Sequence, residues 1–113
     1  MRAKERSYSA YTKDAALLLG KHIQLARKAR KLTERELSER VGIARATLQK
    51  IEKGDLKCEL GTVFEAAAIV GVTLFEVEQR FQSFASKIES VNDKLALLPK
   101  SVRKPLKEVD DEF

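Results

Sequence analysis

Residues that interrupt helices are scarce before position 98. The only two prolines, Pro99 and Pro105, lie in the last fifteen positions, and five of the 113 residues are glycine. Tryptophan is absent and aromatic residues make up 6% of the chain, although 43% of it is apolar. This content suits a small helical core better than a sandwich or a barrel. We therefore predict an all-α protein of one compact unit with tails.

The sequence also lacks the features of exported, membrane-spanning and metal-stapled proteins. Its longest uncharged apolar runs, such as residues 15–19, are five residues long, far short of a membrane span or a signal-peptide core. One cysteine, Cys58, and one histidine, His22, provide neither an internal disulfide nor a zinc cluster. We expect a cytoplasmic protein with no membrane contact, no metal and no cofactor. Cys58 is expected to be a structural thiol, with a redox thiol as the alternative, and His22 to be a packed or interface residue.

Positive charge is concentrated in the first half of the chain. Residues 1–53 contain fourteen Lys or Arg and six Asp or Glu, whereas residues 54–113 contain eight and eleven. Residues 21–31 contain five basic residues and no acid. This asymmetry favours an anionic partner for the N-terminal half, with a solvated helix face as the alternative.

Caps and glycines divide the first 73 residues into a flexible basic arm, residues 1–11, and a run of short helices, residues 12–73. Thr12 is expected to cap a first helix that ends near Lys31 and carries Asp14 in its first turn. Its apolar residues form two faces, which predicts two packing partners. The first face contains Leu19, Ile23 and Ala26, and the second contains Ala15, Leu18, His22, Leu25 and Ala29.

Three further helices are predicted from their caps. Thr33 and Glu36 form a capping box, so a helix begins at Glu34 and ends before Gly42. A second helix is predicted over residues 44–53 and a third over residues 60–70, each followed by glycine. The inward residues are expected to be Leu37 and Val41, then Leu48 and Ile51, then Leu60, Val63, Phe64 and Ala67.

Residues 74–98 carry an apolar heptad pattern, which predicts one long helix that binds another helix. The pattern comprises Leu74, Val77, Phe81, Phe84, Ile88, Val91, Leu95 and Leu98. We expect Phe81, Phe84, Ile88, Val91 and Leu95 to form a dimer or partner interface, with folding back onto the same domain as the alternative. We expect residues 99–113 to be a charged flexible tail.

The segment TERELSERVGIARATLQKIEKG, residues 33–54, resembles the Xre/Cro-type helix-turn-helix family, whose fold is lambda-repressor-like. The resemblance covers about residues 19–72. Its matching positions are Thr33, Glu36, Leu37, Gly42, Thr47, Leu48, Ile51, Glu52 and Gly54. The segments LKCELGTVFEAAAIVGVTLF and LLPKSVRKPLKEVDDEF are further similar to Xre-type antitoxins of the HipB kind, which are encoded beside HipA-like kinase toxins.

The resemblance implies a five-helix DNA-binding domain in which residues 44–53 form the helix that enters the major groove. Ala44 would also face the groove. The implied base-reading residues are Arg45, Ala46, Gln49 and Lys50, and the implied phosphate contacts are Arg35, Thr47, Lys53, Lys57 and the N-terminus of the helix at Glu34. Arg27 and Glu52 match a structural pair of the family.

Two residues depart from the family pattern. Glu34 replaces the usual Gln, so a phosphate or base contact is expected to be lost or redirected, and Ala44 replaces the usual Ser cap. The predicted function is that of a non-enzymatic repressor that binds double-stranded DNA as a homodimer on an inverted repeat and serves as the antitoxin of a kinase toxin. The alternatives are a phage-type or metabolic repressor without a toxin, and an interaction module built on the heptad helix.

Overall fold

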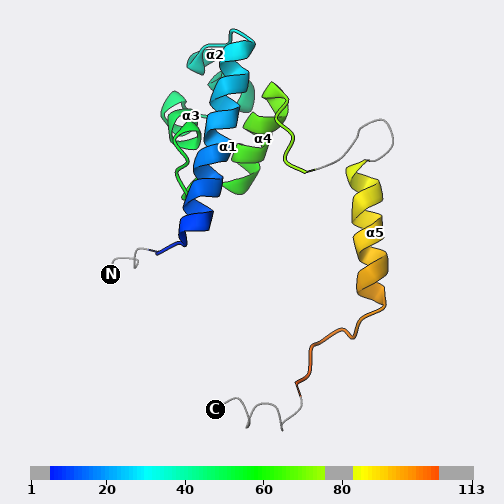
Figure 1. The fold of residues 1–113 in the computed structure, drawn as a ribbon. Coiled ribbons are helices and arrows are strands. Elements are labelled where there is room, and N and C mark those ends of the chain that lie inside the picture. Colours follow the sequence, from blue (N-terminus) through cyan, green and yellow to red (C-terminus); the bar gives the residue numbers. More distant parts are fainter. Residues whose placement is uncertain (1–5, 76–82, 105–113) are drawn as a thin grey trace. The chain divides into compact units, whose positions relative to one another are not determined.

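The computed structural model describes residues 6–75 and 83–104. These residues form five helices and no strands (Figure 1). The helices are α1 (Ala10–Ala29), α2 (Glu34–Val41), α3 (Arg45–Glu52), α4 (Leu60–Val70) and α5 (Phe84–Ala96). The prediction of an all-α protein with five helices is confirmed for this part of the chain. Residues 1–75 and 76–113 form two separate units, so α5 is not part of the unit that contains α1 to α4.

The first helix begins three residues earlier than predicted. Its N-cap is Ser9, whose hydroxyl accepts the backbone N–H of Thr12 at 3.2 Å, so Thr12 is a donor to the cap and not the cap itself. Asp14 consequently lies beyond the first turn, and the helix ends at Ala29. The predicted arm, residues 1–11, was too long at its C-terminal end, and residues 1–5 lie outside the described residues.

The caps of α2 and α3 follow the sequence closely. The backbone N–H of Glu36 donates to Thr33 Oγ1 at 3.0 Å, and that of Thr33 donates to Glu36 Oε1 at 2.8 Å, so the predicted capping box is confirmed. Gly42 ends α2 in the left-handed conformation with φ of 85°, which residues with a Cβ resist. Ala44 is the N-cap of α3 and makes no side-chain capping bond.

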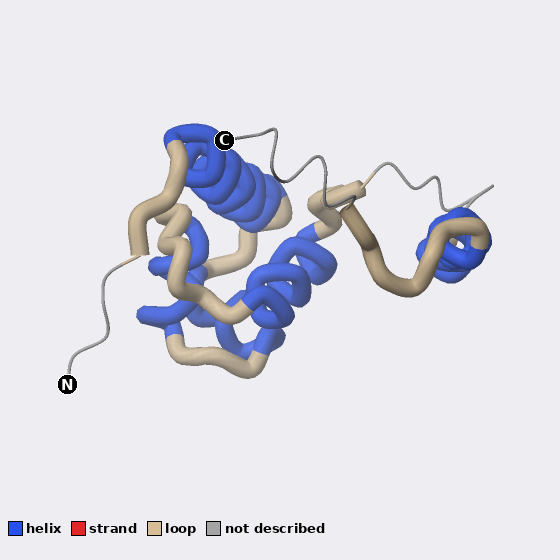
Figure 2. The backbone as a smooth tube through the Cα atoms, turned by 90° about the horizontal axis from the view of Figure 1, so that it is seen from below, coloured by secondary structure: helices blue, strands red, loops and turns tan. Residues whose placement is uncertain are grey.

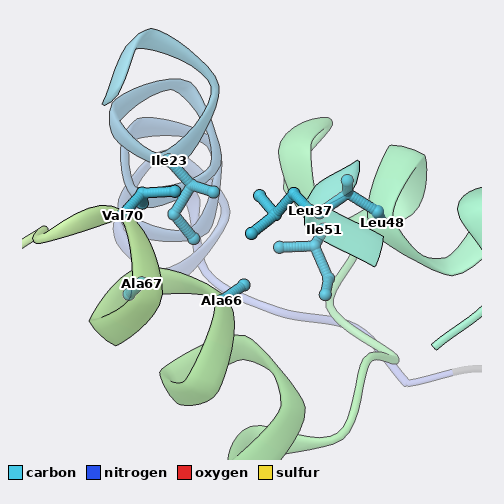
Figure 3. Close-up of a cluster of buried hydrophobic side chains, with 7 residues drawn as sticks. All are labelled: Ile23, Leu37, Leu48, Ile51, Ala66, Ala67 and Val70. Atoms are coloured by element: carbon cyan, nitrogen blue, oxygen red, sulfur yellow. The ribbon is translucent and has the colours of Figure 1, made fainter. Parts of the chain in front are cut away.

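Helices α1 to α4 of the first unit lie close together (Figure 2), and they share one apolar core. Its members come from every helix of that unit, and in Figure 3 their side chains point toward a shared interior. They are Ile23, Leu37, Leu48, Ile51, Ala66, Ala67 and Val70. The core is small, so the loss of one large side chain here would remove a substantial part of the folding free energy.

The predicted core face of α4 was partly wrong. Leu60 is 68% exposed and Phe64 is 36% exposed. The core face is instead centred on Ala66, Ala67 and Val70, because small alanines allow α4 to lie close to its neighbours. Leu60, at the first position of the helix, lies beyond the part that the core covers.

The second apolar face of α1 is not packed within the first unit. Leu18 is 58% exposed and Leu25 is 66% exposed, and Ala15, His22 and Ala29 are exposed as well. The opposite side of the helix carries Gly20, Ile23 and Arg27 into the core. The expectation that this helix has two packing partners is therefore met on one face only within residues 6–75.

Two glycines allow α1 and α3 to meet backbone to backbone. A Cβ on Gly20 would lie 2.5 Å from the carbonyl oxygen of Ile51, and a Cβ on Gly54 would lie 2.7 Å from Leu17 Cα. Both distances are well below ordinary van der Waals contact. Gly20 therefore serves close helix packing, which offsets the roughly 1 kcal/mol that glycine costs in a helix.

The prediction of a single helix over residues 74–98 was wrong at both ends of that segment. Leu74 and Phe75 lie in a bend, where Leu74 packs against the core of the first unit. The hydroxyl of Ser83 accepts the N–H of Ser86 at 3.1 Å and caps the N-terminus of α5, and Leu98 lies beyond the end of that helix. Phe81 and Val77 lie outside the described residues.

The described part of the heptad pattern is exposed on α5. Ile88, Val91 and Leu95 are 58%, 54% and 58% exposed, and Phe84 is 57% exposed. Among the residues that the structure describes, no helix combines the length and the apolar content needed to cross a bilayer.

Candidate functional site

The outer face of α3 carries the predicted base-reading side chains. Arg45, Ala46 and Lys50 are exposed and Gln49 is half-buried, whereas Leu48 and Ile51 on the opposite face are buried in the core. This alternation follows from the helical period, which places residues three and four apart on one side. The four predicted residues therefore lie together on the surface of α3, and Thr47 is half-buried beside them.

A buried ion pair fixes the C-terminal end of α3 to α1. Arg27 Nε donates to Glu52 Oε2 at 2.7 Å, and its Nη2 donates to Glu52 Oε1 at 3.1 Å. A third donor, Nη1, reaches the carbonyl of Leu32 at 2.9 Å. Both side chains of the pair are about 5% exposed. The hydrogen bonds to Glu52 raise the pKa of Arg27, and the pair holds α3 in place.

Glu34, whose role the sequence did not settle, contacts two side chains of α3. One of its oxygens, Oε1, accepts from Arg45 Nε and from Gln49 Nε2, each at 3.0 Å. The hydrogen bond from Gln49, followed by that from Arg45, holds the pKa of the Glu34 carboxyl below its usual value of 4.5. The carboxylate at the first position of α2 thus contacts two of the predicted base-reading residues. Sequence reasoning recognised Glu34 as unusual but could not identify these partners, because they lie on another helix.

The predicted phosphate contacts are also at the surface. Arg35, Lys53 and Lys57 are exposed, and Arg35 pairs with Glu39 at 3.3 Å in an ion pair that is exposed on both sides. The capping box uses the N–H groups of Thr33 and Glu36. The N-terminus of α2 therefore has fewer N–H groups to offer a phosphate than an uncapped helix would.

Three surface cavities extend this cationic region beyond the predicted residues. A cavity of about 460 Å³ has Lys28, Arg35 and Arg45 in its lining. A cavity of about 400 Å³ has Lys21 and Lys53, and Glu34 borders both. A third, of about 440 Å³, is lined by Arg6, Ser7, Tyr8, Lys13, Asp55, Leu56 and Lys57. Of these cations Lys21, Lys28, Arg6 and Lys13 were missed as site residues, although the basic run at residues 21–31 was a signal for the first two.

The two isolated candidate residues do not build a reactive site. Burial, together with repulsion from Asp55, raises the pKa of the Cys58 thiol, which disfavours the thiolate that redox chemistry needs. His22, expected to be packed or at an interface, is exposed and is not packed into the core. Among residues 6–75 and 83–104, no three His, Cys, Asp or Glu side chains form a group that could hold a metal ion.

Comparison with known proteins identifies the central part of the chain. Residues 23–77 match a protein-family model described as helix-turn-helix, and this range contains α2, the Gly42 turn and α3. Searches of curated proteins and of solved structures gave no match.

Proposed function

Because residues 23–77 place the chain in the helix-turn-helix family of the Xre and lambda-repressor-like type, a family of DNA-binding regulators, we propose that the protein is a sequence-specific transcriptional repressor. It acts as a homodimer on an inverted-repeat operator and reads bases with α3. The observation that carries this proposal is the outer face of α3, where Arg45, Ala46, Gln49 and Lys50 lie together. The core and the Arg27–Glu52 pair hold the helix from behind.

Each residue on this face has a chemical role in base reading. A guanidinium such as that of Arg45 donates to the O6 and N7 acceptors of guanine, an amide such as that of Gln49 pairs with adenine, and the methyl of Ala46 contacts a thymine methyl. Arg35, Thr47, Lys53 and Lys57 contact phosphates and position the helix. The surrounding lysines add attraction for any duplex, because neutralised phosphates release counterions.

The homodimer is proposed to form through α5. Ile88, Val91 and Leu95 recur at heptad spacing and are each more than half exposed, as expected of a helix that pairs with a second copy. Two reading helices in successive major grooves lie about 34 Å apart, so the half-sites are expected about 10 bp apart, centre to centre, or a multiple of that.

Paired variants test base reading. A duplex is first selected from a random pool by the wild-type chain, and a scrambled duplex of the same composition serves for comparison. Arg45→Ala is expected to lose affinity for the selected duplex by about tenfold or more and to lose little on the scrambled one. Lys57→Ala is expected to weaken both duplexes alike and to reduce the salt slope by about one unit.

A matched control and a refuting result complete this experiment. Lys100→Ala removes one charge from the exposed segment after α5, outside both the helix-turn-helix unit and the proposed dimer helix, and is expected to leave both affinities unchanged within about twofold. Equal losses on both duplexes for Arg45→Ala would exclude base reading by this residue. If no duplex can be selected at low ionic strength, the repressor proposal fails.

The antitoxin role is the narrower part of the proposal. It rests on the similarity of residues 56–75 and 97–113 to HipB-type antitoxins, and it requires a HipA-like kinase encoded beside this chain. Stoichiometric co-purification of such a kinase from cells that express both genes would support it. A repressor that binds its operator but never retains the neighbouring gene product would be of the phage or metabolic type.

A further inference from the structure

Glu34 contacts two predicted base-reading residues and borders two of the cationic cavities. Its carboxylate oxygen Oε1 accepts from both Arg45 and Gln49 at 3.0 Å. Its side chain is 27% exposed, whereas that of Arg45 is 66% exposed. It also borders two cavities whose linings carry cations, Lys28 and Arg35 in one and Lys21 and Lys53 in the other. A polyanion attracted by these cations must therefore approach a fixed negative charge.

The contacts of Glu34 occupy the donors that recognition would use. The Nε–H of Arg45 and one N–H of Gln49 are already paired within the protein, and a carboxylate accepts hydrogen bonds as a phosphate does. The lowered pKa of Glu34 keeps this carboxylate charged at neutral pH. In the free protein, Arg45 and Gln49 are consequently bound to an internal anion.

On the basis of the proposed function, we propose that Glu34 is a specificity-determining residue that makes DNA compete with an internal carboxylate for Arg45 and Gln49. On a non-cognate duplex, Arg45 gains only a phosphate in exchange for Glu34, so it stays with Glu34 and contributes nothing. On a cognate duplex, guanine and adenine edges replace the contacts that are lost. Glu34 thereby lowers the affinity for non-cognate DNA more than the affinity for cognate DNA. Specificity then comes from an interaction that disfavours the wrong partner.

The substitution Glu34→Gln tests this mechanism because it removes the charge and nearly preserves the shape. The probes are the selected and scrambled duplexes described above, titrated over a range of salt concentrations. Without the charge, Arg45 is free to contact a phosphate on any sequence. Affinity for the scrambled duplex is expected to rise about tenfold, with a salt slope steeper by about one unit. Affinity for the selected duplex is expected to rise about threefold or less, with its slope unchanged, so the specificity ratio falls.

A matched control separates this effect from net charge. Glu65→Gln removes one negative charge from an exposed position of α4 and is expected to leave the specificity ratio unchanged. Thermal unfolding by circular dichroism verifies that both variants fold. The capping box of Thr33 and Glu36 does not involve the Glu34 side chain, so α2 is expected to remain intact.

Four outcomes would overturn the proposal, each in a different way. A parallel rise on both duplexes would show that Glu34 acts only as a charge. A loss on the selected duplex alone would show that Glu34 positions the reading residues and does not compete with DNA. If the wild-type chain fails to discriminate between any duplexes, the proposed function itself is wrong, whereas a discriminating wild type with an unchanged Glu34→Gln refutes only the role of Glu34.

Discussion

The Arg27–Glu52 pair provides the sharpest test of how α3 is held in place. Arg27→Met removes the two charged hydrogen bonds to Glu52, at 2.7 and 3.1 Å, and the bond to the Leu32 carbonyl at 2.9 Å. The apolar stem of Arg27 is replaced by a side chain of similar length. The carboxylate of Glu52, which is about 5% exposed, then remains in the protein without a cation.

The expected magnitude follows from which partner is left behind. Leaving one charge of a buried pair uncompensated costs about 3–5 kcal/mol. In the double variant Arg27→Met/Glu52→Met no buried charge remains, and apolar replacements of buried pairs are often neutral. The partly buried Leu32 carbonyl still loses a donor, which costs about 1 kcal/mol. The double variant is therefore expected to be more stable than Arg27→Met alone, with a coupling energy of about 2 kcal/mol or more.

Urea unfolding followed by circular dichroism measures these free energies for the wild type, both single variants and the double variant. Arg35→Met is the control, because Arg35 and Glu39 form an exposed pair at 3.3 Å, and its effect is expected to stay within about 1 kcal/mol. If the double variant loses the sum of the two single losses, the two charges do not compensate each other, and our account of how α3 is anchored is wrong.

Three further predictions concern the scaffold. Gly20→Ala is expected to lower the melting temperature, because the new Cβ would lie 2.5 Å from the Ile51 carbonyl and overpacking of about 1–3 kcal/mol exceeds the helix-propensity gain of about 1 kcal/mol; a higher melting temperature would contradict this. Ala44→Ser adds the capping hydroxyl that α3 lacks and is expected to raise stability by about 1 kcal/mol, measured in urea, whereas an unchanged midpoint would mean that the hydroxyl does not cap. The backbone and side-chain bonds to Thr33 lower the pKa of Glu36 below 4.5, so its contribution is complete above pH 4.5 and is lost as the pH falls through the lower folded value. Glu36→Gln is expected to flatten this part of the stability profile, and a profile as steep as that of the wild type would assign the acid dependence to other groups.

The sequence could predict those features that depend on neighbours along the chain. The capping box of Thr33 and Glu36, the turn at Gly42 and the bounds of α2 and α4 follow from local hydrogen bonding and backbone conformation. The errors concern choices between equivalent local signals. Ser9 and Thr12 are both good caps, and only the fold determines which one begins α1. The heptad spacing begins at Leu74, which lies in a bend and not in a helix. Apolar spacing alone does not show where a helix begins.

The residues on the outer face of α3 could be predicted from the sequence, but their contacts with α2 could not. Helical period and motif position were enough to place Arg45, Ala46 and Lys50 on one face, and the structure also brings Arg27 against Glu52. The contacts of Glu34 could not be derived, because they depend on the angle between α2 and α3. That angle results from core packing around residues such as Leu37 and from the turn at Gly42.

The two glycines at the α1–α3 contact have a consequence for how this protein can diverge. Where Gly20 meets the carbonyl of Ile51 and Gly54 meets Leu17, main chain touches main chain, so neither glycine carries a side chain that could be trimmed to tilt α3. On the proposed function, a lineage that acquires a new target sequence must then keep the helix where it is and exchange the groups displayed on it. Related chains with different target sequences should accordingly superimpose closely at this junction and differ mainly in the side chains that face the duplex.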